Sequence, residues 1–447
     1  MDLGTVHTET DGINIYASTN DYSLKAMVGL VPGAKWNARE GRWKIPLTWA
    51  AVKQLRGTFG EALELDESMI SWGQQELYDR IIPCMALRER LESLTAEDYD
   101  PRLYPYQAAG ADFLIAAGEA ILSDPPGAGK TCTAVSAARY VGALPALVIA
   151  PKSTLVSWAR EIEQWWPGNP VYVIDGPKAK RQKIFQEAMK EPSWVIINWE
   201  SVRIHSRLAP YGSVRLSEDE RTPKELNQIP FQLVIADEAH RMQDAKSKQT
   251  RAVWAVGDMD SVQYRWALTG TPLTKQIDTI WSILRFIKKE EHPSKVAFVD
   301  RYALTRVVPW GSGTEVIGLN PDHEEEFQEI FQPRFRRMPK EVILPQLPPI
   351  QRTRRYLEMK PEQLRAYNQM MEDMVAESET GELIIAQNPA VKMLRMVQFS
   401  SACVDMKPGP DLEFVARLTD PSNKLEDRKS TRLNSSHIQK SRMPSSA

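Results

Sequence analysis

Residues 119–135, EAILSDPPGAGKTCTAV, place an apolar strand before a glycine-rich loop and a helix that begins near Lys130. Glycines allow such a loop to curl until its backbone N–H groups point inward, and the helix N-terminus adds a positive dipole. This arrangement suits a chain of phosphates, with Lys130 near the terminal phosphates and Thr131 as a ligand of Mg²⁺. The alternative is a glycine turn that only caps a helix.

The loop departs from the pattern GxxxxGK[ST] at its first position, where Asp124 stands in place of glycine. Pro125 and Pro126 have no N–H to offer, so the backbone donors must come from residues 127–131. We expect the whole loop to bind ATP with Mg²⁺ through Asp124, Pro125, Pro126, Gly127, Ala128, Gly129, Lys130 and Thr131.

A second run, FQLVIADEAH at residues 231–240, ends an apolar strand with Asp237 and Glu238. In a parallel α/β sheet the C-terminal ends of the strands form the edge where ligands bind, so both acids are expected beside the glycine loop. There Asp237 can hold Mg²⁺, and Glu238 can orient and deprotonate the attacking water. An isolated pair of acids would only cap the next helix, and the presence of the glycine loop favours the catalytic interpretation.

Residues 105–290 alternate short apolar runs with segments of helical periodicity; the runs are EAILSD, ALVIAP, WVIIN, LVIAD and YRWALTG. This alternation is typical of an α/β fold, in which helices cover both faces of a parallel sheet. We predict a small α+β domain (1–90), a linker (91–103), a nucleotide-binding lobe (104–290), a helical extension with a connector (291–350) and a second α/β unit (351–426).

Several motifs follow one another in a specific order: YPYQ, DPPGAGKT, APKSTLVSWARE, INWES, DEAHRMQDAKSKQTRAV and ALTGTPLTKQIDTIWSILRFI. On these motifs residues 104–350 resemble the first motor lobe of Swi/Snf-type ATPases of helicase superfamily two, and the likeness continues through FRRMPKEVILPQLPP to PSNKLE. The resemblance implies a complete RecA-like lobe with a DEAH box and an incomplete second RecA-like lobe. It also implies an ATP hydrolase that depends on DNA and moves along duplex or forked DNA.

The same resemblance implies roles for single residues. Gln107 would bind the adenine edge, since a carboxamide both donates and accepts. His240, counted as catalytic with Lys130, Asp237 and Glu238, would link the nucleotide site to the DNA side together with Thr269. Contacts with the DNA backbone, which small hydroxyls and loop amides can make, are expected from Pro151, Lys152, Ser153, Thr269, Gly270 and Thr271, with Asn198 and Glu200 on the same edge. For each residue an ordinary polar cap or turn is the alternative.

The first segment contains VPGAKWNAREGRWKIPLTWAAVKQL, in which tryptophans alternate with basic residues. Trp36, Arg42 and Trp43 could stack on unpaired bases and neutralise phosphates. The alternative is a small domain that uses its tryptophans as core. The string resembles the HARP-type module of annealing helicases, which implies recognition of branched or forked DNA.

Residues 427–447, DRKSTRLNSSHIQKSRMPSSA, are rich in serine and basic residues and have no periodicity for packing. Three interpretations are open: a disordered basic tail that assists DNA binding, a natural truncation, and translated sequencing-adapter DNA, which we favour. Motors of this type take transition-state arginines from a second lobe, so we expect weak turnover from this polypeptide. The alternative function is a module that binds ATP and DNA without productive movement.

The 447 residues include 56 Lys and Arg against 58 Asp and Glu, a net charge of -2, so any DNA contact must be local. Three cysteines without CxxC spacing indicate a reducing compartment. No apolar stretch is long enough to cross a membrane, and we expect a cytoplasmic protein without a membrane partner. A compact motor without chromatin-type modules suggests a bacterium or bacteriophage, with DNA repair among the roles considered. The pairing of DEAH with TGT argues against a P-loop kinase or a metabolic NTPase.

Overall fold

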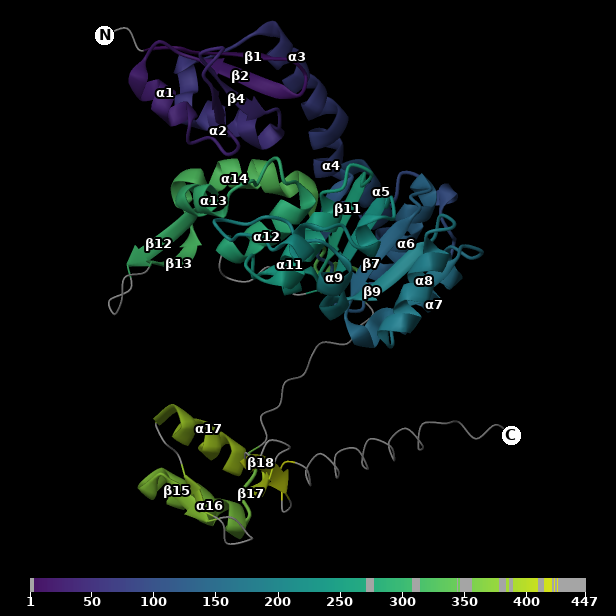
Figure 1. The fold of residues 1–447 in the computed structure, drawn as a ribbon, viewed down its shortest axis with the longest axis vertical. Coiled ribbons are helices and arrows are strands. Elements are labelled where there is room, and N and C mark those ends of the chain that lie inside the picture. The colour runs from purple at the N-terminus through teal and green to yellow at the C-terminus, as the bar shows by residue number, and fades with distance from the viewer. Residues whose placement is uncertain are drawn as a thin grey trace. The chain divides into compact units, whose positions relative to one another are not determined.

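The computed structural model describes residues 4–270, 277–307, 314–343, 345, 356–377, 383–385, 389–408, 414–419, 422 and 424. The chain divides into two compact units, residues 1–348 and 349–447, and each is described by itself (Figure 1). Within the described ranges no helix is both long enough and apolar enough to cross a membrane.

An α+β module with a five-stranded sheet begins the first unit. The strand order is β3-β4-β2-β1-β5, and only the β1 and β5 pair is parallel. Inward-facing residues Val6, Ile15 and Ile45 pack with Leu55 in a core of their own. The strands are β1 (Val6–Thr10), β2 (Asn14–Ser18), β3 (Lys35–Asn37), β4 (Arg42–Pro46) and β5 (Leu63–Leu65). The helices are α1 (Tyr22–Val28), α2 (Trp49–Phe59), α3 (Glu67–Glu76) and α4 (Ile82–Leu87).

One carboxylate fastens residues 91–103 to the next helix, α5 (Pro105–Ala117). Asp112 of α5 accepts four hydrogen bonds of 2.7–2.9 Å, from the Ser93, Thr95 and Tyr99 hydroxyls and the Leu94 N–H. Four donors satisfy the hydrogen-bonding capacity of this buried carboxylate. The segment between the small module and α5 is therefore an ordered part of the first unit.

A seven-stranded parallel sheet lies at the centre of the first unit and confirms the predicted α/β fold (Figure 1). Its order is β14-β6-β11-β10-β7-β9-β8. The strands are β6 (Glu119–Leu122), β7 (Ala146–Ala150), β8 (Val171–Ile174), β9 (Trp194–Asn198), β10 (Leu233–Asp237), β11 (Tyr264–Leu268) and β14 (Phe335–Arg336).

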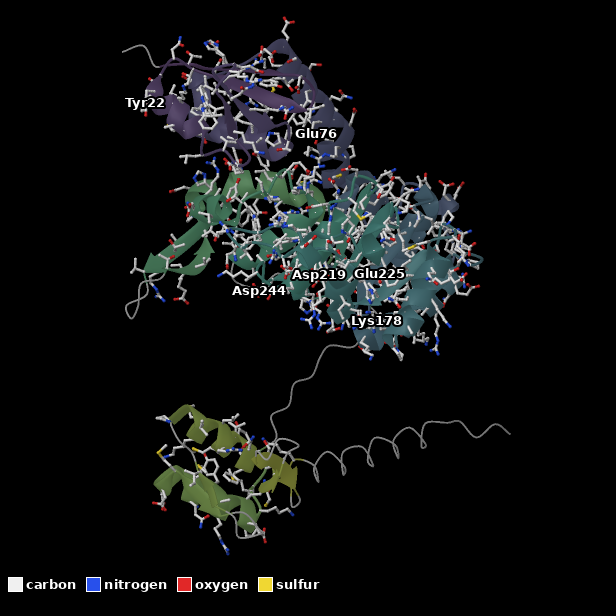
Figure 2. All side chains as sticks on the ribbon, in the orientation of Figure 1. Tyr22, Glu76, Lys178, Asp219, Glu225 and Asp244 are labelled. Carbon is white, nitrogen blue, oxygen red and sulfur yellow. The ribbon has the colours of Figure 1, made fainter. Side chains whose placement is uncertain are left out.

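Helices cover both faces of this sheet, which explains why its inner strands are apolar on both sides over most of their length. Along β7, Ala146, Val148 and Ala150 pack on the face of α5, α6 and α7, whereas Leu147 and Ile149 pack on the face of α8, α9, α11 and α12. Charged side chains such as Lys178 and Asp244 lie on the outer surface (Figure 2). The helices are α6 (Lys130–Val141), α7 (Leu155–Trp165), α8 (Lys178–Ala188), α9 (Trp199–His205), α10 (Glu218–Arg221), α11 (Lys248–Gly257) and α12 (Ile277–Ile287).

The helical extension after α12 joins the small module to the sheet. Gln54 of α2 donates to the Tyr302 hydroxyl at 2.9 Å, and that hydroxyl donates to Glu326 at 2.6 Å. Arg301 pairs with the same carboxylate at 2.6 Å. These buried polar contacts hold α2 against the extension. Its elements are α13 (Lys295–Tyr302), β12 (Ala303–Val307), β13 (Thr314–Leu319), α14 (Glu324–Phe331) and α15 (Lys340–Ile343).

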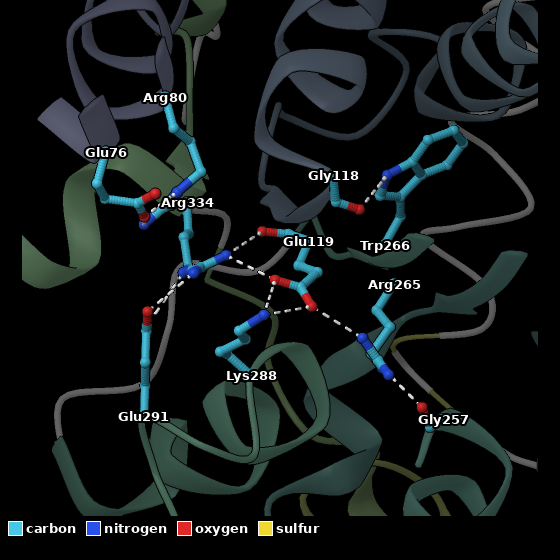
Figure 3. Close-up of polar contacts among 10 residues, drawn as sticks. All are labelled: Glu76, Arg80, Gly118, Glu119, Gly257, Arg265, Trp266, Lys288, Glu291 and Arg334. Atoms are coloured by element: carbon cyan, nitrogen blue, oxygen red, sulfur yellow. Dashed lines mark hydrogen bonds and ion pairs between the residues drawn. The ribbon is translucent and has the colours of Figure 1, made fainter. Parts of the chain in front are cut away.

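A buried ionic cluster fixes the extension to the start of β6 (Figure 3). Glu119 accepts hydrogen bonds from Arg265 at 2.8 Å and from Lys288 and Arg334 at 3.0 Å. Arg334, whose side chain is 4% exposed, also donates to both oxygens of Glu291 at 2.9 and 3.1 Å. Because buried charges are tolerated only when closely paired, each member of the cluster depends on the others.

The second unit is small in its described part. Its helices are α16 (Pro361–Asp373) and α17 (Pro389–Phe399), and its strands are β15 (Val375–Glu377), β16 (Leu383–Ile385), β17 (Cys403–Pro408) and β18 (Phe414–Thr419). The strands form two antiparallel hairpins. Within the described residues of this unit the paired strands are all antiparallel, and the start of a second RecA-like lobe, expected over residues 351–426, stays a prediction.

The ionic cluster makes the stability of the fold depend on pH. Burial acts to raise the pKa of Glu291, but the Arg334 guanidinium outweighs it and holds that pKa at about 2. Burial lowers the pKa of the neighbouring His292 to about 4. Both values lie below the ordinary ones of 4.5 and 6.5, so the unfolded chain binds these protons more tightly. Stability is therefore complete above pH 6.5 and is lost as the pH falls, first through His292 and then through Glu291.

We predict that His292→Gln flattens the fall in stability between pH 7 and pH 5, to which His292 contributes about 2 kcal/mol. The measurement is the free energy of urea unfolding at both pH values for the two proteins. Burial also lowers the pKa of His205, but it does so in both proteins and cancels in the difference. An identical fall in the variant would contradict the prediction.

Candidate nucleotide-binding site

The predicted motifs meet at the C-terminal edge of the central sheet because all its strands run in one direction. The glycine loop follows β6, Thr269 follows β11, Asp237 ends β10, Pro151 follows β7, and Asn198 ends β9. Since β11 lies between β6 and β10, the loop after β11 stands between the glycine loop and the two acids.

The glycine loop has the left-handed turns that it needs to curl. Gly127 and Gly129 have φ values of 85° and 82°, a region that residues with side chains rarely adopt. A Cβ at Gly129 would collide with the Gln107 amide nitrogen and would lie 2.9 Å from the Cys132 sulfur. Gly129 also caps the N-terminus of α6, so the backbone N–H groups and the helix dipole point to the same place.

Gln107 is placed at the glycine loop with both ends of its carboxamide engaged. Its Nε2 donates to the Ala128 carbonyl at 2.9 Å, and its Oε1 accepts from the Tyr104 N–H at 2.9 Å. The Tyr106 hydroxyl donates to the same Ala128 carbonyl at 3.1 Å. The residue therefore supports the loop, and its contact with adenine stays a prediction.

The side chain of Asp124 has a structural role, and its predicted part in ATP binding stays a prediction. Its Oδ1 accepts from the backbone N–H of Met338 at 2.9 Å, and the residue is only 3% exposed. The carboxylate thus ties the glycine loop to the connector 335–343. Pro126 faces the loop after β11, where a Cβ on Gly270 would lie 3.0 Å from the proline ring.

Lys130 lies inside the curl of the loop. Its Nζ donates to the Asp124 carbonyl at 2.8 Å and contacts the Pro125 carbonyl at 3.4 Å. Burial lowers the pKa of Lys130, and the attraction of Glu238, Asp124 and Asp237 opposes that shift. The ammonium group therefore lies in the curl of the loop, where a lysine that binds phosphate is expected.

Asp237 is fixed by three donors, two of which the sequence did not reveal. Its Oδ2 accepts from the Trp158 indole at 2.9 Å, and its Oδ1 accepts from the Glu238 N–H at 3.0 Å. The Trp199 indole donates to its carbonyl at 2.9 Å. Both tryptophans lie in apolar helical patterns that predict core positions, so their sequence context carries no sign of this second function. Burial raises the pKa of Asp237, and the hydrogen bond from Trp158 opposes the rise.

Glu238 is turned toward the edge of the sheet by its backbone. It has φ 52° and ψ 51°, a left-handed conformation that costs about 1–3 kcal/mol for such a residue. Its side chain is 40% exposed and approaches His240 Nδ1 at 3.3 Å. A carboxylate held by hydrogen bonds beside a more open one suits the two roles predicted for the pair.

The loop after β11 begins with a buried residue. Thr269 is fully buried, and its hydroxyl lies 3.5 Å from His240 Nδ1, while its contact with DNA stays a prediction. The contact with His240 agrees with the predicted link between the two residues. A Cβ on Gly270 would lie 3.3 Å from Lys130 Nζ, which places this loop beside the nucleotide site. Thr271 lies outside the described residues.

The donor set fits Mg²⁺ bound together with a nucleotide. Within the described ranges no group of three or more His, Cys, Asp or Glu side chains could hold a metal alone. Mg²⁺ usually takes one or two protein oxygens together with the phosphates of the substrate, and Asp237 with the Thr131 hydroxyl would supply them. When bound, the cation would neutralise charge on the phosphates.

The residues predicted to meet the DNA backbone lie farther along the same edge. Lys152 is 72% exposed and pairs with Asp175 at 3.8 Å, and Ser153 is exposed. Asn198 donates to Glu200 at 2.9 Å, and Arg241 donates to the other Glu200 oxygen at 2.8 Å. The loop 151–153 is thus open to a ligand, while Glu200 is held by its neighbours.

The aromatic and basic residues of the small module lie in its own sheet. Trp36 is 39% exposed and contacts Trp43 edge to face at 5.5 Å, while Trp43 packs against the module's core. Arg42 is paired with both Glu9 and Glu40, which weakens its attraction for phosphate. Binding of forked DNA by these residues stays a prediction.

Comparison with known proteins finds several relatives. Chromodomain-helicase-DNA-binding protein 7 of Homo sapiens is 25% identical over 345 residues, which are 72% of this chain and 10% of that protein. ISWI chromatin-remodeling complex ATPase ISW1 of Saccharomyces cerevisiae is 29% identical over 195 residues, 42% of this chain and 16% of the relative. The chain thus spans a small part of these relatives, and both are eukaryotic, so they do not support a bacterial or phage source.

Among solved structures, the Sulfolobus solfataricus SWI2/SNF2 ATPase core in complex with dsDNA is similar, with 21% identity and a TM-score of 0.42. The match covers 68% of this chain and 59% of that one. The model of the SNF2-related domain matches residues 106–403. That range includes the glycine loop, the two acids and the connector, and on it the chain belongs to the SNF2-related domain family.

Proposed function

We propose that the chain is the ATP-hydrolysing part of a DNA translocase of Swi/Snf type, which binds ATP with Mg²⁺ and moves on duplex or forked DNA. The observation that carries the proposal is the placement of Lys130, Asp237 and Glu238 around one glycine loop in a member of this family. The DEAH assignment of residues 237–240 belongs to the same proposal.

Each side chain has a task that its geometry suits. Lys130 exchanges the loop carbonyls for the terminal phosphates of ATP, and Asp237 with Thr131 holds the cation. Glu238, exposed at the edge of the sheet, orients the attacking water and accepts its proton. His240 lies between Glu238 and Thr269 and connects the acid to the loop after β11.

The DNA partner is proposed to lie along loop 151–153, where the exposed Lys152 and Ser153 offer a charge and a hydroxyl to backbone phosphates. The test is ATP hydrolysis with and without duplex and forked DNA. Stimulation by DNA supports a translocase. Binding of both ligands without turnover would instead favour the alternative, a module without productive movement.

We predict that Lys130→Ala reduces ATP affinity at least about tenfold, because the loop loses the ammonium group that lies inside its curl. Equilibrium titration with a fluorescent ATP analogue measures this loss. Lys178→Ala, which removes an exposed lysine of α8, is the matched control and should bind as the original chain does. Hydrolysis that survives in Lys130→Ala would refute the nucleotide site.

We predict that Glu238→Gln binds ATP within about threefold of the original chain but hydrolyses it roughly 100-fold more slowly, since the amide cannot accept the proton of water. Single-turnover hydrolysis with excess protein detects slow reactions. Glu163→Gln, on the exposed side of α7, is the control. If Glu238→Gln loses binding and hydrolysis equally, the general-base role is wrong.

A further inference from the structure

Trp158 connects two motifs that are far apart in the sequence. It lies on α7, and its indole N–H donates to Asp237 Oδ2, 79 residues away, at 2.9 Å. The ring is 1% exposed and packs in the core between α6, α7 and the sheet. Trp158 therefore cannot touch DNA or nucleotide itself, and any effect on either must act through the carboxylate.

The other contacts of Asp237 do not fix the orientation of its carboxylate, so this orientation depends on the hydrogen bond from Trp158. The Glu238 N–H holds Oδ1, but it belongs to the adjacent residue and moves with it. The Trp199 indole holds the backbone carbonyl and does not touch the carboxylate. The hydrogen bond from Trp158 joins the carboxylate itself to a helix, so it sets the rotation of the carboxylate relative to the rest of the lobe.

The start of α7 is built to transmit a contact at the edge of the sheet. The turn Lys152–Thr154 precedes α7 directly. The Thr154 hydroxyl and N–H both donate to the Pro151 carbonyl at 3.0 Å, so the turn and the helix form one stiff piece. Trp158 lies about one helical turn beyond Thr154.

We propose that Trp158 is a positioning residue: it holds Asp237 in the orientation that binds Mg²⁺ and passes a contact at loop 151–154 to that carboxylate. The inference rests on the proposed function. Outer partners that orient a metal ligand commonly change metal affinity by tenfold or more when they are lost.

The experiment compares Trp158→Phe with Trp165→Phe in the full chain. Phenylalanine keeps most of the apolar ring and removes the N–H. Trp165 lies on the same helix, is 8% exposed and donates to Glu161 at 2.7 Å, so it is a matched control that loses a comparable hydrogen bond. Binding of a fluorescent ATP analogue is measured across a Mg²⁺ titration, in EDTA, and with duplex DNA present.

For Trp158→Phe we expect the half-saturating Mg²⁺ concentration to rise about tenfold with unchanged binding in EDTA, and we expect DNA to lose its effect on Mg²⁺-dependent binding. Trp165→Phe should behave as the original chain. In a double-mutant cycle, Trp158→Phe should add little to Asp237→Asn, which a purely structural role would not produce. Equal Mg²⁺ dependence in both tryptophan variants overturns the inference alone, whereas an original chain that binds no nucleotide overturns the proposed function.

Discussion

All seven strands of the central sheet run in the same direction, and every other feature of the site depends on this constraint. A parallel sheet must bury both faces, so the middles of its inner strands are apolar and the polar groups lie at the strand ends and in the loops that follow them. The loops after β6, β7, β9, β10 and β11 therefore converge on one edge. The insertion of β11 between β6 and β10 then places Gly270 against Lys130 and Thr269 against His240.

The connector after α14 supports the glycine loop through contacts with β6, Ser123 and Asp124. β14 pairs with β6, and the Ser123 N–H donates to the Arg336 carbonyl at 2.8 Å. The Arg336 side chain is fully buried and donates to backbone carbonyls at the ends of α4 and α5. Asp124 then accepts from Met338. The residue that breaks the usual glycine pattern is thus the residue that fastens the connector, so its departure from that pattern has a structural cause.

Much of this arrangement could be predicted because it depends on local patterns. The apolar runs predicted the strands, and GxGKT and DE predicted which strand ends carry charge. The order of strands could not be predicted, since it depends on pairing between segments that are not consecutive in the sequence, such as β6 with β11 and β10 with β7. For the same reason the sequence could not show that Trp158 and Trp199 donate to Asp237, that Thr269 is buried, or that Asp124 accepts from Met338. Helical tryptophans and a loop aspartate have the same sequence pattern whether or not they contact a carboxylate or a backbone amide.

The hydrogen bonds already present in the glycine loop limit which interactions can favour nucleotide binding. Lys130 already donates to loop carbonyls and Gln107 already spans Tyr104 and Ala128, so a bound nucleotide exchanges hydrogen bonds with these groups, and such an exchange contributes little net free energy. The charge of Lys130 supplies only part of the attraction, because Asp237 and Glu238 oppose it and repel an anionic nucleotide. Further attraction must then come from the loop amides, the dipole of α6 and a divalent cation on Asp237. Of these three, only the binding of the cation depends on the rotation of a side chain, which is that of Asp237. The Trp158 indole holds this side chain, and Trp158 lies on α7, the helix that follows the proposed DNA loop.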